Sequence, residues 1–189
     1  MTEIIKSLDP DHPYSPILKS VRDQCDSHKF MSGEIIVEVA QIVYEYSDVA
    51  QIFQEFCKVS GLGFHDITYH KDEGERWIAS NNLDTTPIEI DREQAYAELN
   101  NTFGVKVNFT ALGTVFSLED IKQIRQEFFG IFTYKPRFYI VRHAEIYKAK
   151  LPQGDFWQSY GVFVVDEKYA GLIWVNDLYD YEKPETELK

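Results

Sequence analysis

The chain has 189 residues, of which 44% are hydrophobic and 15% are aromatic, so it carries enough apolar material for a core and is not expected to be disordered throughout. Its 31 acidic residues outnumber its 19 basic residues, which leaves a formal net charge of −12. A field of this sign repels phosphate, so it disfavours sequence-independent binding to nucleic acid and adhesion to anionic membranes.

Cysteine content and hydropathy indicate a protein of a reducing compartment. Cys25 and Cys57 are the only cysteines and no CxxC pair occurs, so neither a zinc knuckle nor a redox dithiol is expected. The first ten residues lack the apolar core of a signal peptide, and no run approaches the length of about 18 apolar residues that spans a bilayer. We therefore expect a cytoplasmic protein that does not cross a membrane.

The N-terminal segment is expected to be a polar arm followed by a short helix. Residues 1–14 are polar and contain two prolines. Ser15 and Pro16 supply an N-cap followed by proline at the first helical position, and apolar residues follow at helical spacing. This pattern predicts a helix over residues 16–28.

The clearest periodicity of the sequence comes next. Between Ile35 and Phe56, apolar residues recur at alternating spacings of four and three, and Gly61 follows. The pattern predicts a long helix near residues 34–59, with a bend at Ser47-Asp48, where a second half could be capped. Such a wide apolar stripe suits a core helix; the alternative is the seam of a homodimer.

After Gly63 the period of the apolar residues changes to two, which is typical of strands. Residues 64–71 and 76–80 are expected to form a hairpin around the loop 72–75. The further expected elements are a strand at 88–90, a helix from an Asp91 cap to about 102, a strand at 105–109, and a helix from a Ser117 capping box to about 130.

The C-terminal third is expected to be rich in strands, at residues 137–147, 157–165 and 169–175, with a tight turn at 166–168 between the last two. The expected fold is an α+β domain over residues 15–176, with an antiparallel sheet and helices packed on one face. An acidic tail over residues 177–189 follows it.

One short motif resembles a known family. Val141-Arg142-His143-Ala144-Glu145 is similar to the opening of the histidine phosphatase (phosphoglycerate mutase-like) superfamily, with Ala144 where that family has glycine. The resemblance implies His143 as a phosphorylated nucleophile and Arg142 as its phosphate clamp. In that family a second catalytic histidine and arginine follow much later, whereas residues 146–189 here contain neither. Phosphoryl transfer needs several cationic donors, so this reading is an alternative.

Two further histidines belong to the predicted hairpin, close to acidic residues. His65 precedes Asp66, and His70 lies two residues before Asp72. Positions 65 and 70 are an odd number apart in a strand, so their side chains point to opposite faces and cannot share one metal ion. No metal site is therefore expected, although His65 and His70 remain candidates for a small hydrolase or transferase.

Basic residues concentrate between positions 134 and 150, among aromatic residues, as in single-strand binders. In so acidic a chain this stretch is expected to pair with acid elsewhere in the fold, so nucleic acid is not an expected partner. No P-loop, GxGxxG motif or nucleophile elbow occurs, and no cofactor is expected.

Acidic segments interleaved with tyrosine are the most distinctive feature of the sequence. No cation occurs between Lys29 and Lys58, and further acids gather around the hairpin and in the tail. Tyrosine rings anchor interfaces and carboxylates steer basic partners. We therefore expect a non-enzymatic module that binds a basic protein, such as an immunity or inhibitor protein. Its expected contact residues are Asp72, Glu73, Glu75, Tyr179, Asp180, Tyr181 and Glu182.

Overall fold

The structure is a computed structural model that describes residues 4–27, 33–46, 48–70, 76–80, 87–107, 116–141, 144–147 and 156–178. In chain order the elements are β1 (Ile5–Ser7), α1 (Ser15–Ser27), β2 (Gly33–Ile42), α2 (Val49–Val59), β3 (Gly63–His70), β4 (Arg76–Ser80), β5 (Ile88–Ile90), α3 (Arg92–Asn101), the π-helical turn η1 (Thr102–Val107), α5 (Leu118–Gly130), β6 (Arg137–Ile140), β7 (Ala144–Tyr147), β8 (Phe156–Val165) and β9 (Tyr169–Leu178). The predicted α+β class is confirmed.

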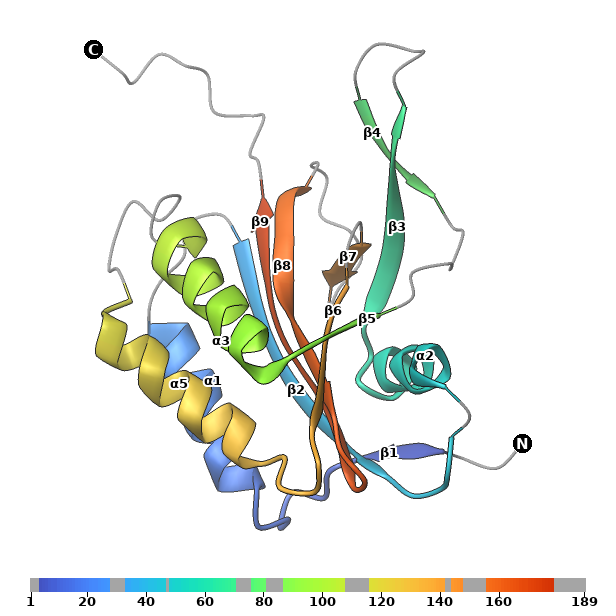
Figure 1. Cartoon of the computed structure of the whole chain (residues 1–189), viewed down its shortest axis with the longest axis vertical. Helices are drawn as coiled ribbons and strands as arrows, with labels where there is room; N and C mark the ends of the chain where they lie inside the picture. Colours follow the sequence, from blue (N-terminus) through green and yellow to red (C-terminus); the bar gives the residue numbers. More distant parts are fainter. Residues whose placement is uncertain are drawn as a thin grey trace.

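A six-stranded antiparallel sheet with the order β1-β2-β9-β8-β6-β5 forms the centre of the fold (Figure 1). Its three long strands pair along most of their length, with Ile35 opposite Val175 between β2 and β9. Near the β8–β9 turn, residues 161–165 and 169–175 are almost continuously apolar, and both faces of the strands are buried there. A smaller sheet with the order β4-β3-β7 lies beside it, and its β3–β4 hairpin confirms the predicted pairing.

Helices α1, α3 and α5 pack against one face of the six-stranded sheet (Figure 1). Val21 of α1, Leu99 of α3 and Ile124 of α5 are buried there in one cluster with Val162 and Ile173 of the sheet. Burial of side chains of this size stabilises the fold by about 1.5–3 kcal/mol each. This face is called the three-helix face below.

The opposite face of the sheet is covered differently. Among the described elements, α2 is the helix that packs there, and Phe53 and Phe56 place their rings 5.1 and 5.3 Å from the ring of Phe163. Trp174 is fully buried in the same cluster. The expectation that helices pack on one face only is therefore wrong, because successive side chains of the central strands are apolar on both faces. This second face is called the α2 face.

The predicted long helix near residues 34–59 is also wrong. Residues 33–42 form strand β2, and a helix begins only at Val49, where Asp48 caps it by accepting a hydrogen bond from the Gln51 N–H at 2.9 Å. β2 is a central strand whose two faces are both buried, so its apolar residues also fit a helical spacing of three and four. Its β-branched residues favour the strand.

The proposed dimer seam depended on that helix and is corrected with it. Ile36, Val37, Val39 and Ala40 are buried inside the sheet, between β1 and β9. The apolar residues of α2 are buried against the same protein. The buried residues of β2 and α2 within this stripe are therefore core, and they offer no helical seam to a second copy.

Several shorter predictions are confirmed. α1 lies within one residue of its predicted bounds, a strand occupies residues 88–90, and α3 and α5 begin with capping boxes at Asp91 and Ser117. The strand predicted at 105–109 is wrong over its described part, since α3 continues there into the π-helical turn η1. The strand predicted at 137–147 is split into β6 and β7, which belong to different sheets.

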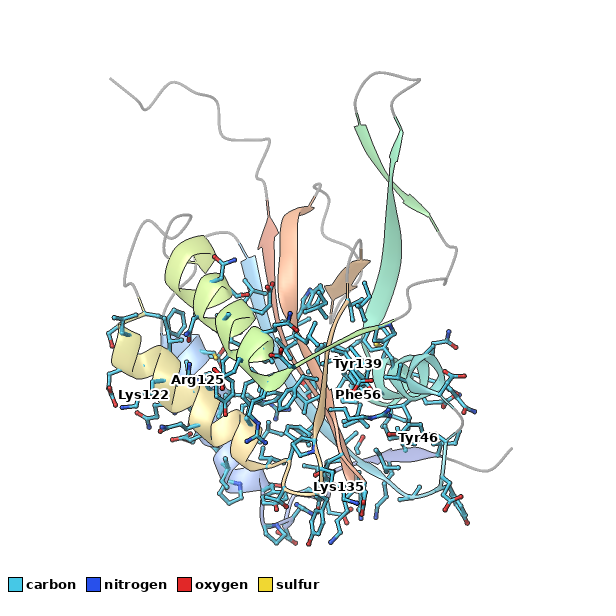
Figure 2. The ribbon with its side chains drawn as sticks, in the orientation of Figure 1. Tyr46, Phe56, Lys122, Arg125, Lys135 and Tyr139 are labelled. Carbon is cyan, nitrogen blue, oxygen red and sulfur yellow. The ribbon has the colours of Figure 1, made fainter. Side chains whose placement is uncertain are left out.

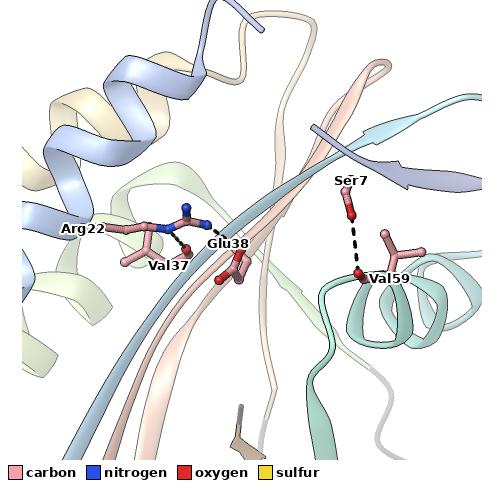
Figure 3. Close-up of polar contacts among 5 residues, drawn as sticks. All are labelled: Ser7, Arg22, Val37, Glu38 and Val59. Atoms are coloured by element: carbon pink, nitrogen blue, oxygen red, sulfur yellow. Dashed lines mark hydrogen bonds and ion pairs between the residues drawn. The ribbon is translucent and has the colours of Figure 1, made fainter. Parts of the chain in front are cut away.

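Polar contacts fasten a helix to the sheet on each side (Figure 3). Arg22 of α1 donates to the Val37 carbonyl at 2.8 Å and to the Glu38 carboxylate at 2.5 Å, so α1 is held to β2. Ser7 of β1 donates to the Val59 carbonyl at the end of α2 at 3.5 Å. No helix of the described residues has the length and hydropathy needed to cross a bilayer.

Candidate functional site

All seven contact residues predicted from sequence, and the candidate pair Arg142 and His143, lie outside the described residues. This applies to the hairpin loop with Asp72, Glu73 and Glu75, to the tail with Tyr179, Asp180, Tyr181 and Glu182, and to Arg142 and His143. They stay predictions.

The register of the smaller sheet shows which residues lie opposite the two hairpin histidines. His65 lies opposite Glu145 of β7, whereas His70 lies opposite Arg76 of β4. The two histidine positions therefore face different neighbours, and only His65 comes close to the segment that follows His143. Among the residues that the structure describes, no three His, Cys, Asp or Glu side chains are grouped closely enough to hold a metal ion.

The described surface is hollowed at one end of the α2 face, where β2 ends, β6 begins and β8 turns into β9. A hollow of about 690 Å³ is lined there by residues 42–46, Lys135, Arg137 and residues 165–167. A second hollow of about 580 Å³ shares Tyr46 and Arg137 with the first and extends toward Asp48, Glu89 and Tyr139. Together these two hollows are called the groove.

The β8–β9 turn is fixed by a buried carboxylate. Asp166 is 3% exposed and accepts hydrogen bonds from the backbone N–H groups of Lys168 at 2.7 Å, Tyr169 at 2.8 Å and Tyr134 at 3.1 Å. A buried charge of this kind is tolerated only when such donors surround it. The bond to Tyr134 ties the turn to the segment before β6, so both walls of the first hollow are held together.

Lys135 lies at the rim of the groove in an unusual backbone conformation. Its φ of 51° is the only positive value at a non-glycine residue within the described part of the chain. The left-handed region is strained for a residue with a Cβ and persists where the surroundings fix it. Its side chain is 91% exposed and lies 3.9 Å from the carboxylate of Glu167.

Arg137 is the central cation of the groove. It donates to the Tyr46 hydroxyl over 3.4 Å, lies 3.9 Å from the Glu89 carboxylate, and its guanidinium carbon is 5.7 Å from the centre of the Tyr139 ring. The hydrogen bond with Tyr46, ahead of the neighbouring charges, raises the pKa of Arg137. Both polar contacts are long, so several of its five N–H donors are poorly engaged.

Tyr139 lies next to Phe56 of α2 (Figure 2), and it lines the second hollow together with Arg137 and Tyr46. The residue is 2% exposed, and its hydroxyl is buried without a hydrogen-bond partner among the described residues. Burial raises the pKa of Tyr139 to about 12, so the hydroxyl keeps its proton and remains a donor. A buried hydroxyl without a partner costs about 1–3 kcal/mol.

The rim of the groove is acidic and aromatic. Glu45, Asp48, Glu89 and Glu167 are exposed around it, and Tyr44 is 57% exposed. Its two cations, Lys135 and Arg137, each lie near one of these carboxylates. The groove therefore carries a surplus of negative charge next to tyrosine rings.

Sequence reasoning missed this site, although part of its signal was visible. Tyr44, Glu45, Tyr46 and Asp48 belong to the cation-free acidic segment, but the sequence predicts the first three inside a long helix and Asp48 at its bend. It shows Arg137 only as part of a basic stretch. When the chain is compared with known proteins, no family model, no curated protein and no solved structure matches it.

Proposed function

We propose that this chain is a non-enzymatic protein-binding module whose acidic, tyrosine-rich surface engages a basic protein. The observation that carries the proposal is the groove, where Tyr44, Tyr46 and Tyr139 gather with more carboxylates than cations. Tyrosine offers a large amphipathic contact area and is enriched among interface anchors. An immunity or inhibitor protein that neutralises a basic toxin or enzyme is one concrete form.

Charge supports a basic partner in particular. The net charge of −12 steers cationic proteins toward the chain over distances near the Debye length, about 8 Å at physiological salt. Glu45 at the rim has no ion pair within the described part of the protein, so a Lys or Arg of the partner can reach it without displacing a cation. The acids of the loop 72–75 and of the tail stay predicted contacts for the same kind of partner.

The experiment is a pull-down with the tagged chain from lysate of its source organism, at low and at high salt, read by mass spectrometry. We expect one basic protein that is retained at low salt and weakened at high salt. Charge-reversal variants then locate the contact: Glu45→Lys with Glu167→Lys in the groove, Asp72→Lys with Glu75→Lys in the loop, and Asp180→Lys with Glu182→Lys in the tail. A partner retained equally by all three variants would contradict the proposal.

A second candidate is a small hydrolase or transferase that acts on a small, possibly phosphorylated ligand. The observation in its favour is the register of the smaller sheet, which sets His65 opposite Glu145, two residues after His143. It predicts phosphoesterase activity that is lost in His143→Ala or in Arg142→Ala. A wild-type protein that turns over no phosphoester in a broad screen, with and without divalent metals, would contradict this candidate.

A further inference from the structure

The second hollow of the groove contains hydrogen-bond donors that the protein itself leaves poorly used. It is lined by Tyr46, Asp48, Val49, Pro87, Glu89, Arg137 and Tyr139. We propose that Arg137, Tyr46 and Tyr139 form a subsite for a carboxylate, and that in the protein complex this carboxylate is the C-terminus of a basic segment of the partner. The first part stands on the geometry alone, whereas the second rests on the proposed function.

The donors come from three different side chains that line one hollow. Arg137 has five N–H donors, and among the described residues its polar contacts are the long ones to Tyr46 and Glu89. The Tyr46 oxygen accepts from Arg137, so its own O–H can donate to a ligand in the hollow that Tyr46 lines. The guanidinium side chain is 47% exposed, so a ligand can reach it from solvent.

Tyr139 supplies the strongest reason to expect a ligand. Its buried hydroxyl lacks a partner in the described part of the fold, and its raised pKa keeps it protonated as a donor. If the hydroxyl served packing only, phenylalanine would fill the same space without the cost of an unpaired polar group. Because the hydroxyl itself is buried, an acceptor in the hollow reaches it once the side chains around it move aside, and binding then removes that cost.

The charge around the subsite selects a singly charged anion. One guanidinium and two neutral hydroxyls match one carboxylate, and Arg pairs with carboxylates through two parallel hydrogen bonds. Glu89 lies 3.9 Å from Arg137, and Asp48 lines the same hollow. Both repel a doubly charged phosphate more strongly than a carboxylate.

The acidic rim indicates what the carboxylate is attached to. A ligand held at Arg137 extends past Asp48 and Glu89 on one side, or past Glu45 and Glu167 on the other. These carboxylates favour cationic groups a few bonds away from the bound one. A basic peptide that ends in a free carboxylate satisfies both requirements.

The first experiment tests the subsite without any partner. The Arg137 side-chain N–H signal of ¹⁵N-labelled protein is followed by NMR during titration with sodium acetate, with sodium chloride at equal ionic strength as reference. We expect saturable shifts with acetate alone. Binding should weaken roughly 10-fold or more in Arg137→Gln and about 2- to 10-fold in Tyr139→Phe.

Matched control variants exist on the three-helix face. There Arg125 stacks over Tyr96 at 4.5 Å and donates to Asn100 at 3.1 Å, so Arg125→Gln and Tyr96→Phe remove the same chemical groups away from the groove. Both should bind acetate as the wild type does. Equal responses to acetate and chloride, unchanged binding in Tyr139→Phe, or tighter binding of inorganic phosphate than of acetate would each overturn the subsite.

The second experiment tests the carboxylate-terminated partner. Two peptides of the sequence Gly-Lys-Arg-Lys-Ala, one with a free C-terminus and one amidated, are titrated beside free lysine. We expect the free-carboxylate peptide to bind about 10-fold more tightly than either comparator, since hydrogen bonds to a charged group carry this difference. Equal binding of both peptides, or binding of lysine as tight as that of the peptide, would overturn the C-terminus assignment. If the wild-type protein does not bind acetate but still captures a basic partner in the pull-down, the subsite is overturned and the proposed function is not.

Discussion

The two faces of the central sheet share the same strands but are covered by different helices. An arginine–tyrosine pair on each face illustrates the difference. On the three-helix face, Arg125 stacks over Tyr96 and donates to Asn100 at 3.1 Å, while Tyr96 stacks on Phe129 with centroids 5.3 Å apart. On the α2 face, Arg137 lies over Tyr139, and its polar contacts within the described residues are longer, 3.4 Å to Tyr46 and 3.9 Å to Glu89.

The difference in helical cover between the two faces indicates where this fold can accommodate a ligand. Three helices cover one face, whereas α2, a helix of 11 residues, covers the part of the other face around Phe163 and Trp174. The groove begins where the cover of α2 ends, near its N-terminal residue Val49. Concave, partly polar sites with underused donors are where binding is expected, because a ligand there supplies contacts that the chain does not make itself.

The largest expected effect on the free energy of unfolding comes from replacing a large buried side chain by alanine on either face. Phe56→Ala on the α2 face and Phe128→Ala on the three-helix face should each lower the free energy of unfolding by about 3–5 kcal/mol, because both side chains are fully buried. Urea denaturation followed by circular dichroism measures both. A loss below about 2 kcal/mol for Phe56→Ala alone would show that α2 is loosely attached, and the contrast between the faces would need revision.

A glycine on each face tests how tightly the strands are covered. A Cβ at Gly161 would lie 2.1 Å from the Ile173 carbonyl oxygen and 2.7 Å from Trp174, whereas a Cβ at Gly171 would meet the end of the Phe132 ring at 2.4 Å. Backbone cannot move aside as a ring can. We therefore expect Gly161→Ala to cost about 3 kcal/mol and Gly171→Ala less, as overpacking does. The reverse order in thermal unfolding would contradict this difference.

The wall of the groove should depend on Asp166. Asp166→Ala leaves three backbone N–H groups without their acceptor, so we expect a loss of about 2–3 kcal/mol in the free energy of unfolding. Asp166→Asn keeps one acceptor oxygen and should lose less. An alanine variant as stable as the wild type in chemical denaturation would show that the turn is held by other contacts.

The smallest effect on stability is expected at Tyr139. Tyr139→Phe removes a buried hydroxyl that has no partner in the described residues, so we expect the variant to be about 1 kcal/mol more stable than the wild type at pH 7, because the cost of the unpaired hydroxyl is removed. A large loss of stability would reveal a structural bond of the hydroxyl and weaken the case for a ligand.

The same variant has a distinct pH dependence. Burial raises the pKa of Tyr139 from 10 to about 12 in the folded protein, so on raising the pH the hydroxyl ionises first in the unfolded chain. The stability that depends on the protonated hydroxyl is therefore fully present below pH 10 and is lost as the pH rises toward 12. The raised pKa values of Cys25 and Cys57, also about 12 through burial, act in the same direction in both proteins. The wild type should therefore lose more stability than Tyr139→Phe over this range.

Much of the fold was predictable because its signals are local. The capping residues Asp91 and Ser117 and the turn at Asp166 act within three or four positions along the chain, and their elements were predicted correctly. β2 was not predictable in the same way, because burial on both faces hides the period of two. The groove depends on contacts between distant positions: Tyr46 and Arg137 are 91 residues apart. No local pattern reports that they meet.

We propose that the acidic, tyrosine-rich groove on the α2 face is where a basic partner binds. The dissociation constant of the captured partner, measured by calorimetry for two charge-reversal variants of equal charge, tests this. One carries Glu45→Lys and Glu167→Lys in the groove, and the other carries Glu93→Lys and Glu119→Lys on α3 and α5, where both acids are exposed. We predict that the groove variant binds about 10-fold or more weakly than the control variant, since contact adds to steering. Equal weakening in both would mean that net charge alone attracts the partner, and it would contradict the groove as the binding site.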